Sequence, residues 1–292
     1  MAALKGMASA CGSATVVNAI ASGKGAAFGI ELRVFAKVEL VKGSREIIGR
    51  LIGESGESPN LIEICVRKVL DHLNLEKAYG ARVETRSEVP IAVGLSSSSA
   101  AANAAVLATF AALDRKPRPE LVLDLGIGAA FEAGVTITGA LDDAAASLYG
   151  CGVITDNLKR RILKRFKIDP KLKVLIYVPP TKSYTSKVRR AQVKPIREAV
   201  EVVHRMALRG KILEALTLNG LLYSSALGQD PMSALEALAN GALAAGMTGT
   251  GSATVAVAKP ASADAIERAW QARPGKVIIT KSTVKGARVE HT

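Results

Sequence analysis

The sequence predicts an α+β fold in two domains. Its 292 residues exceed the length that a single hydrophobic core usually serves. A hydrophobic content of 49% is ample for packed interiors. Strand and helix patterns occur on both sides of a basic stretch, which places the boundary near 156–172. We therefore predict an N-terminal domain over residues 1–160 and a C-terminal domain over 161–292.

Two strands are predicted at the start of the first half, over 14–20 and 30–41. In these segments apolar and polar residues alternate, or β-branched residues follow one another. The glycine-rich segment "ASGKGAAFG" connects them. Apolar residues recur every three or four positions over 59–79 and predict a helix opened by Pro59. The remaining elements predicted in this half are a strand over 81–90, helices over 100–113 and 120–132, and strand, turn, short helix and strand over 135–155.

The second half contains a strong strand, "KVLIYVPP", which two prolines end. The helices predicted after it span 194–210, 211–228 and 231–245. "MTGTGSATVAVAKP" (247–260) is a glycine turn that leads into a strand, and helix and strand material follows over 263–290.

Charge is concentrated in one part of the chain. The chain has a net charge of +13. Residues 156–211 account for all of it, because they contain 17 Lys and Arg residues against 4 Asp and Glu residues. Apolar residues at helical intervals in "NLKRRILKRFKIDPKLK" (157–173) favour an amphipathic helix with a basic outer face. Attraction of anionic substrates and RNA binding are the alternatives, although no stacking aromatics or RNA recognition motif supports the latter.

Cysteine usage and hydropathy predict a cytoplasmic, soluble protein. Cys11, Cys65 and Cys151 are odd in number, widely spaced and without a CxxC pair, as expected for buried thiols in a reducing compartment. The N-terminal residues lack the features of a signal peptide. The longest apolar segment, 100–113, is too short to cross a bilayer. We therefore expect no membrane partner.

The segment "GLSSSSAA" (94–101) precedes a predicted helix and has the properties of an anion site. Backbone N–H groups, the positive end of the helix dipole and nearby hydroxyls could hold an ATP triphosphate with Mg²⁺. It is not a Walker loop, because G-x-x-x-x-G-K-[ST] is absent from the chain. The alternative is a flexible loop followed by a capped helix.

The same segment resembles the phosphate loop of the GHMP small-molecule kinases, P-x-x-x-G-L-G-S-S-A-A. Pro90, Gly94, Leu95, Ser97 and Ser98 match this motif. Ser96 stands where the family has its second glycine, and Ser99 where it has its first alanine. A serine forced to positive φ would carry backbone strain.

Two further segments resemble GHMP motifs in the family's order. "FEAGVTITGALDDAAASLYG" (131–150) is similar to the acidic segment, in which a glutamate binds Mg²⁺ and an aspartate eleven residues later faces the substrate hydroxyl. Glu132 and Asp143 have this separation. "MTGTGSATVAV" resembles the late glycine-rich motif, and "GSATVVNAIASGKGAAFGIEL" (12–32) resembles the first motif loosely.

The sequence of residues 16–32 and 136–150 is similar to that of the archaeal-type shikimate kinases, a branch of the GHMP kinases. This resemblance implies a two-domain GHMP fold with its active site in the cleft between the domains. It also implies ATP-dependent phosphorylation of the shikimate 3-hydroxyl in aromatic amino-acid (chorismate) biosynthesis. Other acceptors, homoserine first and mevalonate second, remain alternatives. An RNA-binding protein is another, because a ribosomal RNA-binding domain shares the N-terminal half of this fold.

The resemblance also implies residue roles. Ser98 and Glu132 would bind Mg²⁺, although Ser98 could instead be an N-cap and Glu132 a solvated charge. Asp143 would accept the proton of the acceptor hydroxyl, unless Asp142 does so or the pair caps a helix. The ATP phosphates would contact the loop residues Pro90, Gly94, Leu95, Ser96, Ser97, Ser98, Ser99 and Ala100.

Several further residues are candidates for contacts with the acceptor or the γ-phosphate. The family's first motif often places a cation beside the catalytic aspartate. Here that region has Thr15, and Lys24 is the candidate replacement. A substrate carboxylate would also need arginine or lysine in the pocket. The other candidates are Asn18, Asp142, Thr248, Gly249, Thr250 and Gly251.

Overall fold

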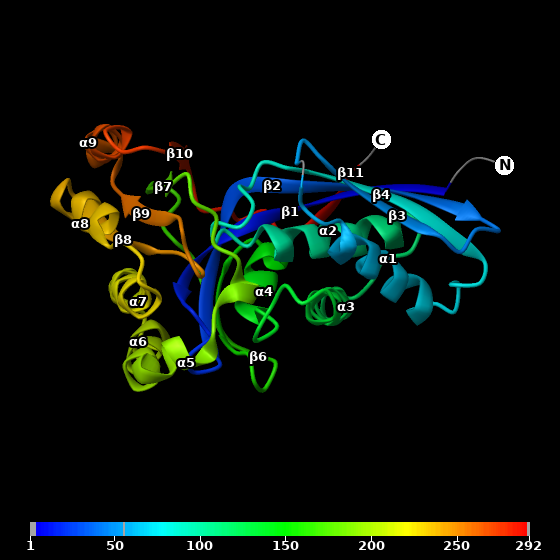
Figure 1. Cartoon of the computed structure of the whole chain (residues 1–292), viewed down its shortest axis with the longest axis horizontal. Helices are drawn as coiled ribbons and strands as arrows, with labels where there is room; N and C mark the ends of the chain where they lie inside the picture. Colours follow the sequence, from blue (N-terminus) through cyan, green and yellow to red (C-terminus); the bar gives the residue numbers. More distant parts are fainter. Residues whose placement is uncertain (1–3, 55, 291–292) are drawn as a thin grey trace.

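The computed structural model describes residues 4–54 and 56–290, which form two β-sheets and the helices that cover them (Figure 1). The first sheet has the path β11-β1-β2-β4-β3, and β5 and β6 extend it from β2. All of its pairings are antiparallel except that of β3 with β4. Its strands are β1 (Leu4–Val17), β2 (Lys24–Lys42), β3 (Ile47–Ile52), β4 (Tyr79–Ser87), β5 (Gly152–Asp156), β6 (Arg161–Phe166) and β11 (Arg288–Glu290).

Four helices cover one face of this sheet: α1 (Asn60–His72), α2 (Ser97–Ala112), α3 (Pro119–Glu132) and α4 (Leu141–Tyr149). α2 and α4 pack on β1 and β2, and α1 and α3 pack on α2. α2 is rich in alanine because it lies unusually close to the sheet. A Cβ at Gly6 would overlap the Ala108 carbonyl oxygen.

The second sheet has the antiparallel order β10-β7-β9-β8. Its strands are β7 (Lys173–Val178), β8 (Ala242–Met247), β9 (Thr254–Ala258) and β10 (Lys276–Thr280). The helices of this half are α5 (Arg190–Val193), α6 (Arg197–Leu208), α7 (Ile212–Leu227), α8 (Met232–Ala239) and α9 (Pro260–Gln271), with 3₁₀ turns η1 (Thr185–Lys187) and η2 (Lys194–Ile196).

The hydrophobic core runs from one sheet into the other. Successive side chains of a strand point to opposite faces, so Val174 and Ile176 of β7 join the core of the first sheet. Leu175 and Tyr177 instead pack with Trp270 of α9 in a smaller cluster. The two sheets therefore share a continuous hydrophobic interior.

The predicted α+β class is correct, but the predicted boundary needs a correction. A cut between 160 and 161 falls inside the hairpin of β5 and β6. The end of the chain also returns to the first sheet, where β11 pairs with β1. Arg33 of β2 fixes this return, because its guanidinium donates to the carbonyl oxygens of Lys285 and Gly286 at 3.2 and 2.8 Å. Arg33 therefore has a structural role.

Three predicted elements are wrong. Residues 161–166 form edge strand β6 and not a basic helix, because the i, i+4 spacing of Ile162 and Phe166 fits a strand face as well as a helix face. The start of 135–155 is a loop and not a strand. The C-terminal end of the predicted helix 231–245 is strand β8, which Gly241 with φ +90° separates from α8.

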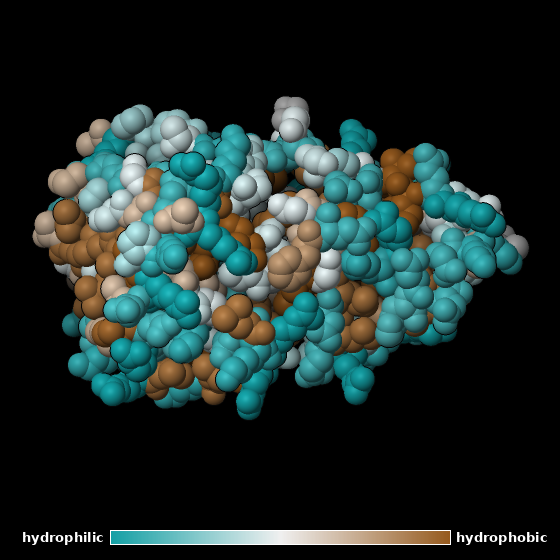
Figure 2. Space-filling view, turned by 60° about the horizontal axis from the view of Figure 1, so that its bottom comes forward, coloured by the Kyte–Doolittle hydropathy of each residue, from teal (hydrophilic) through white to brown (hydrophobic). Residues whose placement is uncertain are grey.

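Charged and polar side chains dominate the surface. In Figure 2 most of the visible face is teal, and the brown apolar residues form separated groups. Within the described ranges, every helix is too short or too polar to traverse a bilayer.

Candidate active site

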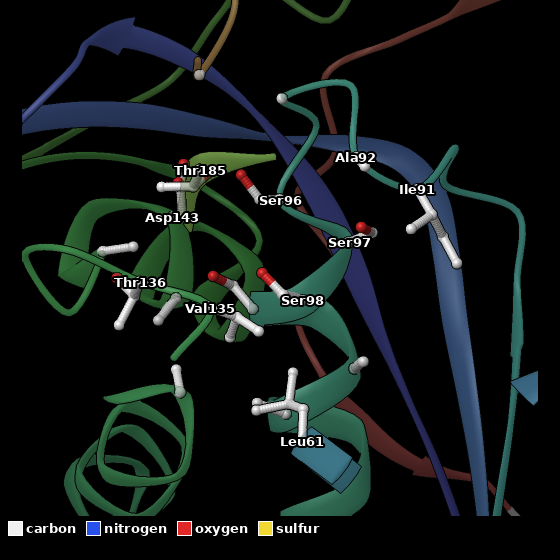
Figure 3. Close-up of a pocket in the computed structure, with 18 of the residues that line it drawn as sticks. Leu61, Ile91, Ala92, Ser96, Ser97, Ser98, Val135, Thr136, Asp143 and Thr185 are labelled. Carbon is white, nitrogen blue, oxygen red and sulfur yellow. The ribbon is translucent and has the colours of Figure 1, made fainter. Parts of the chain in front are cut away.

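A cavity of about 260 Å³ lies over the start of α2. Its walls come from the loop before α2, the loop 135–140, the start of α4, the segment between β3 and α1, and residues 183–186. Figure 3 shows Ser98 at the beginning of α2, with its hydroxyl directed toward Val135 and Thr136. Asp143, Thr185 and Ser96 line the same cavity.

The loop before α2 exposes its backbone to this cavity. Ser96 is the N-cap residue and has left-handed backbone angles, φ +60° and ψ +34°. No side chain caps the helix, so Ser98 is not an N-cap and that alternative is wrong. Of the eight predicted phosphate-loop residues, the five that line the cavity are Gly94, Ser96, Ser97, Ser98 and Ser99. Pro90, Leu95 and Ala100 lie outside its lining, and the Leu95 side chain is buried in the core.

The late glycine-rich segment packs directly against this loop. Thr248 Oγ1 donates to the Gly94 carbonyl oxygen at 2.9 Å and accepts from the Thr15 amide at 2.9 Å. Gly249 N donates to Thr15 Oγ1 at 2.9 Å. Thr15 therefore ties the late glycine-rich segment to β1, and Thr248 ties that segment to the phosphate loop.

Only some of the candidate residues in this region line the cavity. Asn18, Gly249 and Thr250 line it, and Asn18 Nδ2 donates to the Gly249 carbonyl oxygen at 2.7 Å. Thr248 and Gly251 do not line it. Thr248 is fully buried, so its role is to hold the loops together.

Asp142 and Asp143 lie in the first turn of α4 and line the same cavity. The N-cap of α4 is Ala140, and no side chain caps this helix. The alternative in which the aspartate pair caps the helix is therefore wrong. Their side chains have different neighbours. Asp142 Oδ1 accepts from Asn157 Nδ2 at 2.8 Å, whereas Asp143 Oδ1 lies 3.0 Å from Ser13 Oγ.

Burial raises the pKa of both carboxyls. For Asp142, burial and then the charge of Asp143 raise the pKa to about 7, and the Asn157 hydrogen bond opposes this. Burial also raises the pKa of Asp143, and hydrogen bonds from Ser96 and Ser13 oppose it. Asp143 keeps partial exposure to the cavity, while Asp142 is 4% exposed. Asp143 is thus the more accessible of the pair.

The raised pKa of Asp142 predicts a stability effect of Asp142→Asn. Because an unfolded aspartate has a pKa of about 3.9, the native carboxyl binds its proton more tightly between about pH 4 and pH 7. The unfolding free energy of the wild type should therefore lose a contribution as pH rises through this window. The variant lacks this loss and should gain stability relative to the wild type. Urea unfolding at several pH values measures it, and a constant difference would contradict it.

Glu132 does not reach the cavity, and its predicted role as a Mg²⁺ ligand is corrected here. It ends α3, is exposed, and pairs with Arg67 and Lys68 of α1. Ala130 of the same helix lines the cavity. Glu132 follows Ala130 by two residues, which corresponds to a rotation of about 200° around the helix axis. Glu132 therefore points to the side of α3 opposite the cavity. The spacing of eleven residues between Glu132 and Asp143 does not indicate which side of α3 the Glu132 side chain occupies.

Lys24 is a second correction. It opens β2 opposite Asp156 of β5, outside the cavity lining. A Cβ at its neighbour Gly25 would contact the Asp142 carboxylate. Since neighbouring residues of a strand face opposite ways, Lys24 points away from the aspartate pair. Its charge acts instead on buried His204 of α6, whose pKa is lowered mainly by burial.

Sequence reasoning missed two sets of residues. Ser13 of β1 is fully buried, and its hydroxyl lies 2.7 Å from Ser96 Oγ. Residues 181–186 are here called the strap, and 183–186 line the cavity. Within the strap, Ser183 N donates to the Ala92 carbonyl oxygen at 2.7 Å, and Thr185 Oγ1 lies 3.2 Å from Thr250 Oγ1. Of these residues, only Ser13 could have been noticed in the sequence, as a serine in a strand of small residues.

The strap is also tied to the segment between β3 and α1. Lys182 Nζ and Tyr184 Oη both lie 2.8 Å from Glu57 Oε1. The hydrogen bond from Lys182, followed by that from Tyr184, lowers the pKa of Glu57 against the opposing effect of burial. The three side chains thus join the two halves of the molecule at the cavity.

Comparison with known proteins identifies the family. The model of the GHMP kinases N terminal domain matches residues 60–151, and that of the GHMP kinases C terminal domain matches 196–276. Shikimate kinase from Methanothermobacter thermautotrophicus is 44% identical over 283 residues, which cover 95% of this chain and 96% of that protein. Shikimate kinase from Methanococcoides burtonii is 43% identical, with coverage of 94% and 96%.

The chain is a GHMP kinase. It belongs to the branch of the archaeal shikimate kinases, as the resemblance in its motifs predicted. Solved GHMP structures share the fold. Homoserine kinase from Cytophaga hutchinsonii has a TM-score of 0.76 at 18% identity, with coverage of 98% of this chain and 97% of that one. Methanococcus jannaschii mevalonate kinase has a TM-score of 0.72 at 16% identity, with coverage of 94% and 98%. This GHMP kinase is thus a small-molecule kinase.

Proposed function

We propose that this GHMP kinase transfers the γ-phosphoryl group of ATP to the 3-hydroxyl of shikimate in the cytoplasm, giving shikimate 3-phosphate and ADP. The observation that carries the proposal is the position of Asp143 beside the uncapped start of α2 in one cavity. This arrangement gives a site for a phosphate chain next to a proton acceptor. The choice of shikimate rests on relatives of that name at 42–44% identity.

The start of α2 suits the phosphates of ATP. Its first turn presents backbone N–H groups and the positive end of the helix dipole to the cavity. Left-handed angles at Ser96 and the φ of +87° at Gly94 turn the loop backbone around this end. The loop residues 94 and 96–99 would therefore bind the β- and γ-phosphates.

The donor set also suits Mg²⁺. Among residues 4–54 and 56–290, no three His, Cys, Asp or Glu side chains form a metal-binding group. Mg²⁺ bound to a nucleotide needs few protein ligands, because phosphates and water supply most of its oxygens. Ser98, whose hydroxyl faces the cavity, would be one protein ligand. Such an ion would neutralise negative charge on the transferred phosphoryl group.

Asp143 would orient the acceptor hydroxyl and accept its proton. Burial raises the pKa of this carboxyl, which makes the ionised form a stronger base than an exposed aspartate. Phosphoryl transfer depends mostly on positioning and charge neutralisation, so modest basicity is enough. Thr185, which lines the same cavity, would bound the acceptor site.

Arg190 is our candidate for binding the shikimate carboxylate. No lysine or arginine of the described chain lines the cavity, contrary to expectation. Arg190 Nη2, however, donates to the carbonyl oxygen of cavity residue Ile137 at 3.1 Å. We expect Arg190→Met to raise KM for shikimate about tenfold, the value of one charge-assisted hydrogen bond, and to leave KM for ATP within twofold. Steady-state kinetics with each substrate varied in turn measures both, and an equal rise in both values would exclude this role.

ADP release tests the function itself. Purified protein with MgATP is offered shikimate, homoserine or mevalonate separately. Turnover on shikimate alone supports the proposal, and turnover on another alcohol keeps the site but replaces the acceptor. If no acceptor supports turnover while RNA binds tightly without ATP and the affinity falls steeply with salt, the RNA-binding alternative takes its place.

A further inference from the structure

Ser96 occupies a backbone conformation that disfavours its own side chain. Its φ of +60° lies in the left-handed region, where a Cβ is strained and glycine is not. The matched family motif has glycine at this position. A serine that persists there indicates that its hydroxyl makes a compensating interaction.

The Ser96 hydroxyl is part of a three-residue hydrogen-bond network. Ser13 Oγ lies 2.7 Å from Ser96 Oγ and 3.0 Å from Asp143 Oδ1, and it can donate its single proton to either atom. Ser13 is itself fixed, because its amide donates to the Leu95 carbonyl oxygen at 3.1 Å and its side chain is fully buried. Strand β1 thus connects the phosphate loop to the aspartate of α4.

The elements around Asp143 present hydroxyl groups to its carboxylate. Strand β1 contributes Ser13, and the phosphate loop contributes Ser96. Helix α4 contributes Asp142, the one titratable group that faces Asp143 from these elements. Lys182 of the strap pairs with Glu57 instead. No ion pair to Asp143 occurs within the described ranges.

We propose that Ser96, held by Ser13, is a positioning residue that orients the Asp143 carboxylate toward the acceptor hydroxyl and keeps it ionised. This inference rests on the proposed function. In the reaction, the acceptor oxygen forms a bond to the γ-phosphorus as the bond from that phosphorus to the ADP oxygen breaks. The hydroxyl proton passes to Asp143. The serine hydroxyls are not consumed and stabilise the charged carboxylate before transfer.

Ser96→Gly is the decisive variant because it relieves the strain and removes the hydroxyl. We expect kcat to fall at least tenfold, and the acidic limb of the kcat/KM profile to move to higher pH as the pKa of Asp143 rises. The melting temperature should stay unchanged or increase. Ser13→Ala should move the same limb in the same direction.

Asp114→Gly is the matched control. Asp114 follows the other end of α2, is exposed, and also has positive φ, +52°. This variant relieves the same kind of strain away from the cavity, so kcat and the pH profile should not change. A Ser96→Gly enzyme with wild-type kcat and pH profile would overturn the inference, as would equal loss of activity in the control.

A carboxyl ¹³C NMR titration of ligand-free protein separates this inference from the proposed function. The Asp143 signal is assigned by its loss in Asp143→Asn. A higher Asp143 pKa in Ser96→Gly than in the wild type supports the network, even if shikimate is not the acceptor. An unchanged titration rejects the network, even if shikimate is phosphorylated.

Discussion

Asp143→Asn is expected to lower kcat about 10³-fold, within the range by which a positioned proton acceptor accelerates a reaction. The amide keeps the size of the carboxyl and can still contact Ser13, but it cannot take the hydroxyl proton. Because the phosphates would bind to residues 94 and 96–99 and not to the Asp143 carboxylate, the Kd for ATP should change by no more than a few-fold. Single-turnover kinetics and calorimetric ATP titration measure the two effects.

Glu132→Gln is the control for that variant. It makes the same carboxylate-to-amide change eleven residues earlier, on the face of α3 that points away from the cavity. We expect wild-type kcat and Mg²⁺ dependence. A loss of activity in Glu132→Gln together with full activity in Asp143→Asn would reverse the assignment of the two carboxylates.

Gly94→Ala is expected to have the largest effect on the structure of the site. Its φ of +87° disfavours any side chain, which costs about 1–2 kcal/mol. The new Cβ would also overlap the Thr248 carbonyl oxygen, a backbone atom that cannot rotate away. We expect a loss of about 3 kcal/mol or more in unfolding free energy and loss of turnover, because the two glycine loops must separate.

Gly43→Ala distinguishes the overlap from the conformational cost. Gly43 has a similar φ, +79°, but a Cβ there would have no atom within 4 Å. Urea unfolding of this variant should show only the cost of positive φ, about 1–2 kcal/mol, and turnover should be normal. If the two variants lose equal stability, the close contact between the loops contributes nothing.

Local patterns predicted much of the molecule. The helix predicted over 120–132 and the strand predicted over 173–178 match α3 and β7, because each is a largely apolar segment with proline near one end. The serine loop was located because small side chains and glycine before a helix have few other uses. Asp143, too, was chosen within one local motif, by its separation of eleven residues from Glu132.

The rest depends on contacts between distant parts of the chain. Ser13 lies 130 residues from Asp143 in sequence, so no local pattern joins them. Whether Glu132 faces the cavity depends on how α3 is rotated against α1 and α2. Edge strand β6 was mistaken for a helix because charges on an exposed strand, which discourage pairing with other chains, resemble the polar face of a helix.

The pairing of β11 with β1 constrains the order of events during synthesis. β1 emerges from the ribosome long before one of its neighbours, because β11 follows it by more than 270 residues. At translation speeds of about 5–20 residues per second, that edge of β1 stays open for about 14–54 seconds. Its exposed hydrogen-bonding groups are a site where a nascent-chain chaperone would be useful and where premature strand pairing between neighbouring polysomal chains would be harmful.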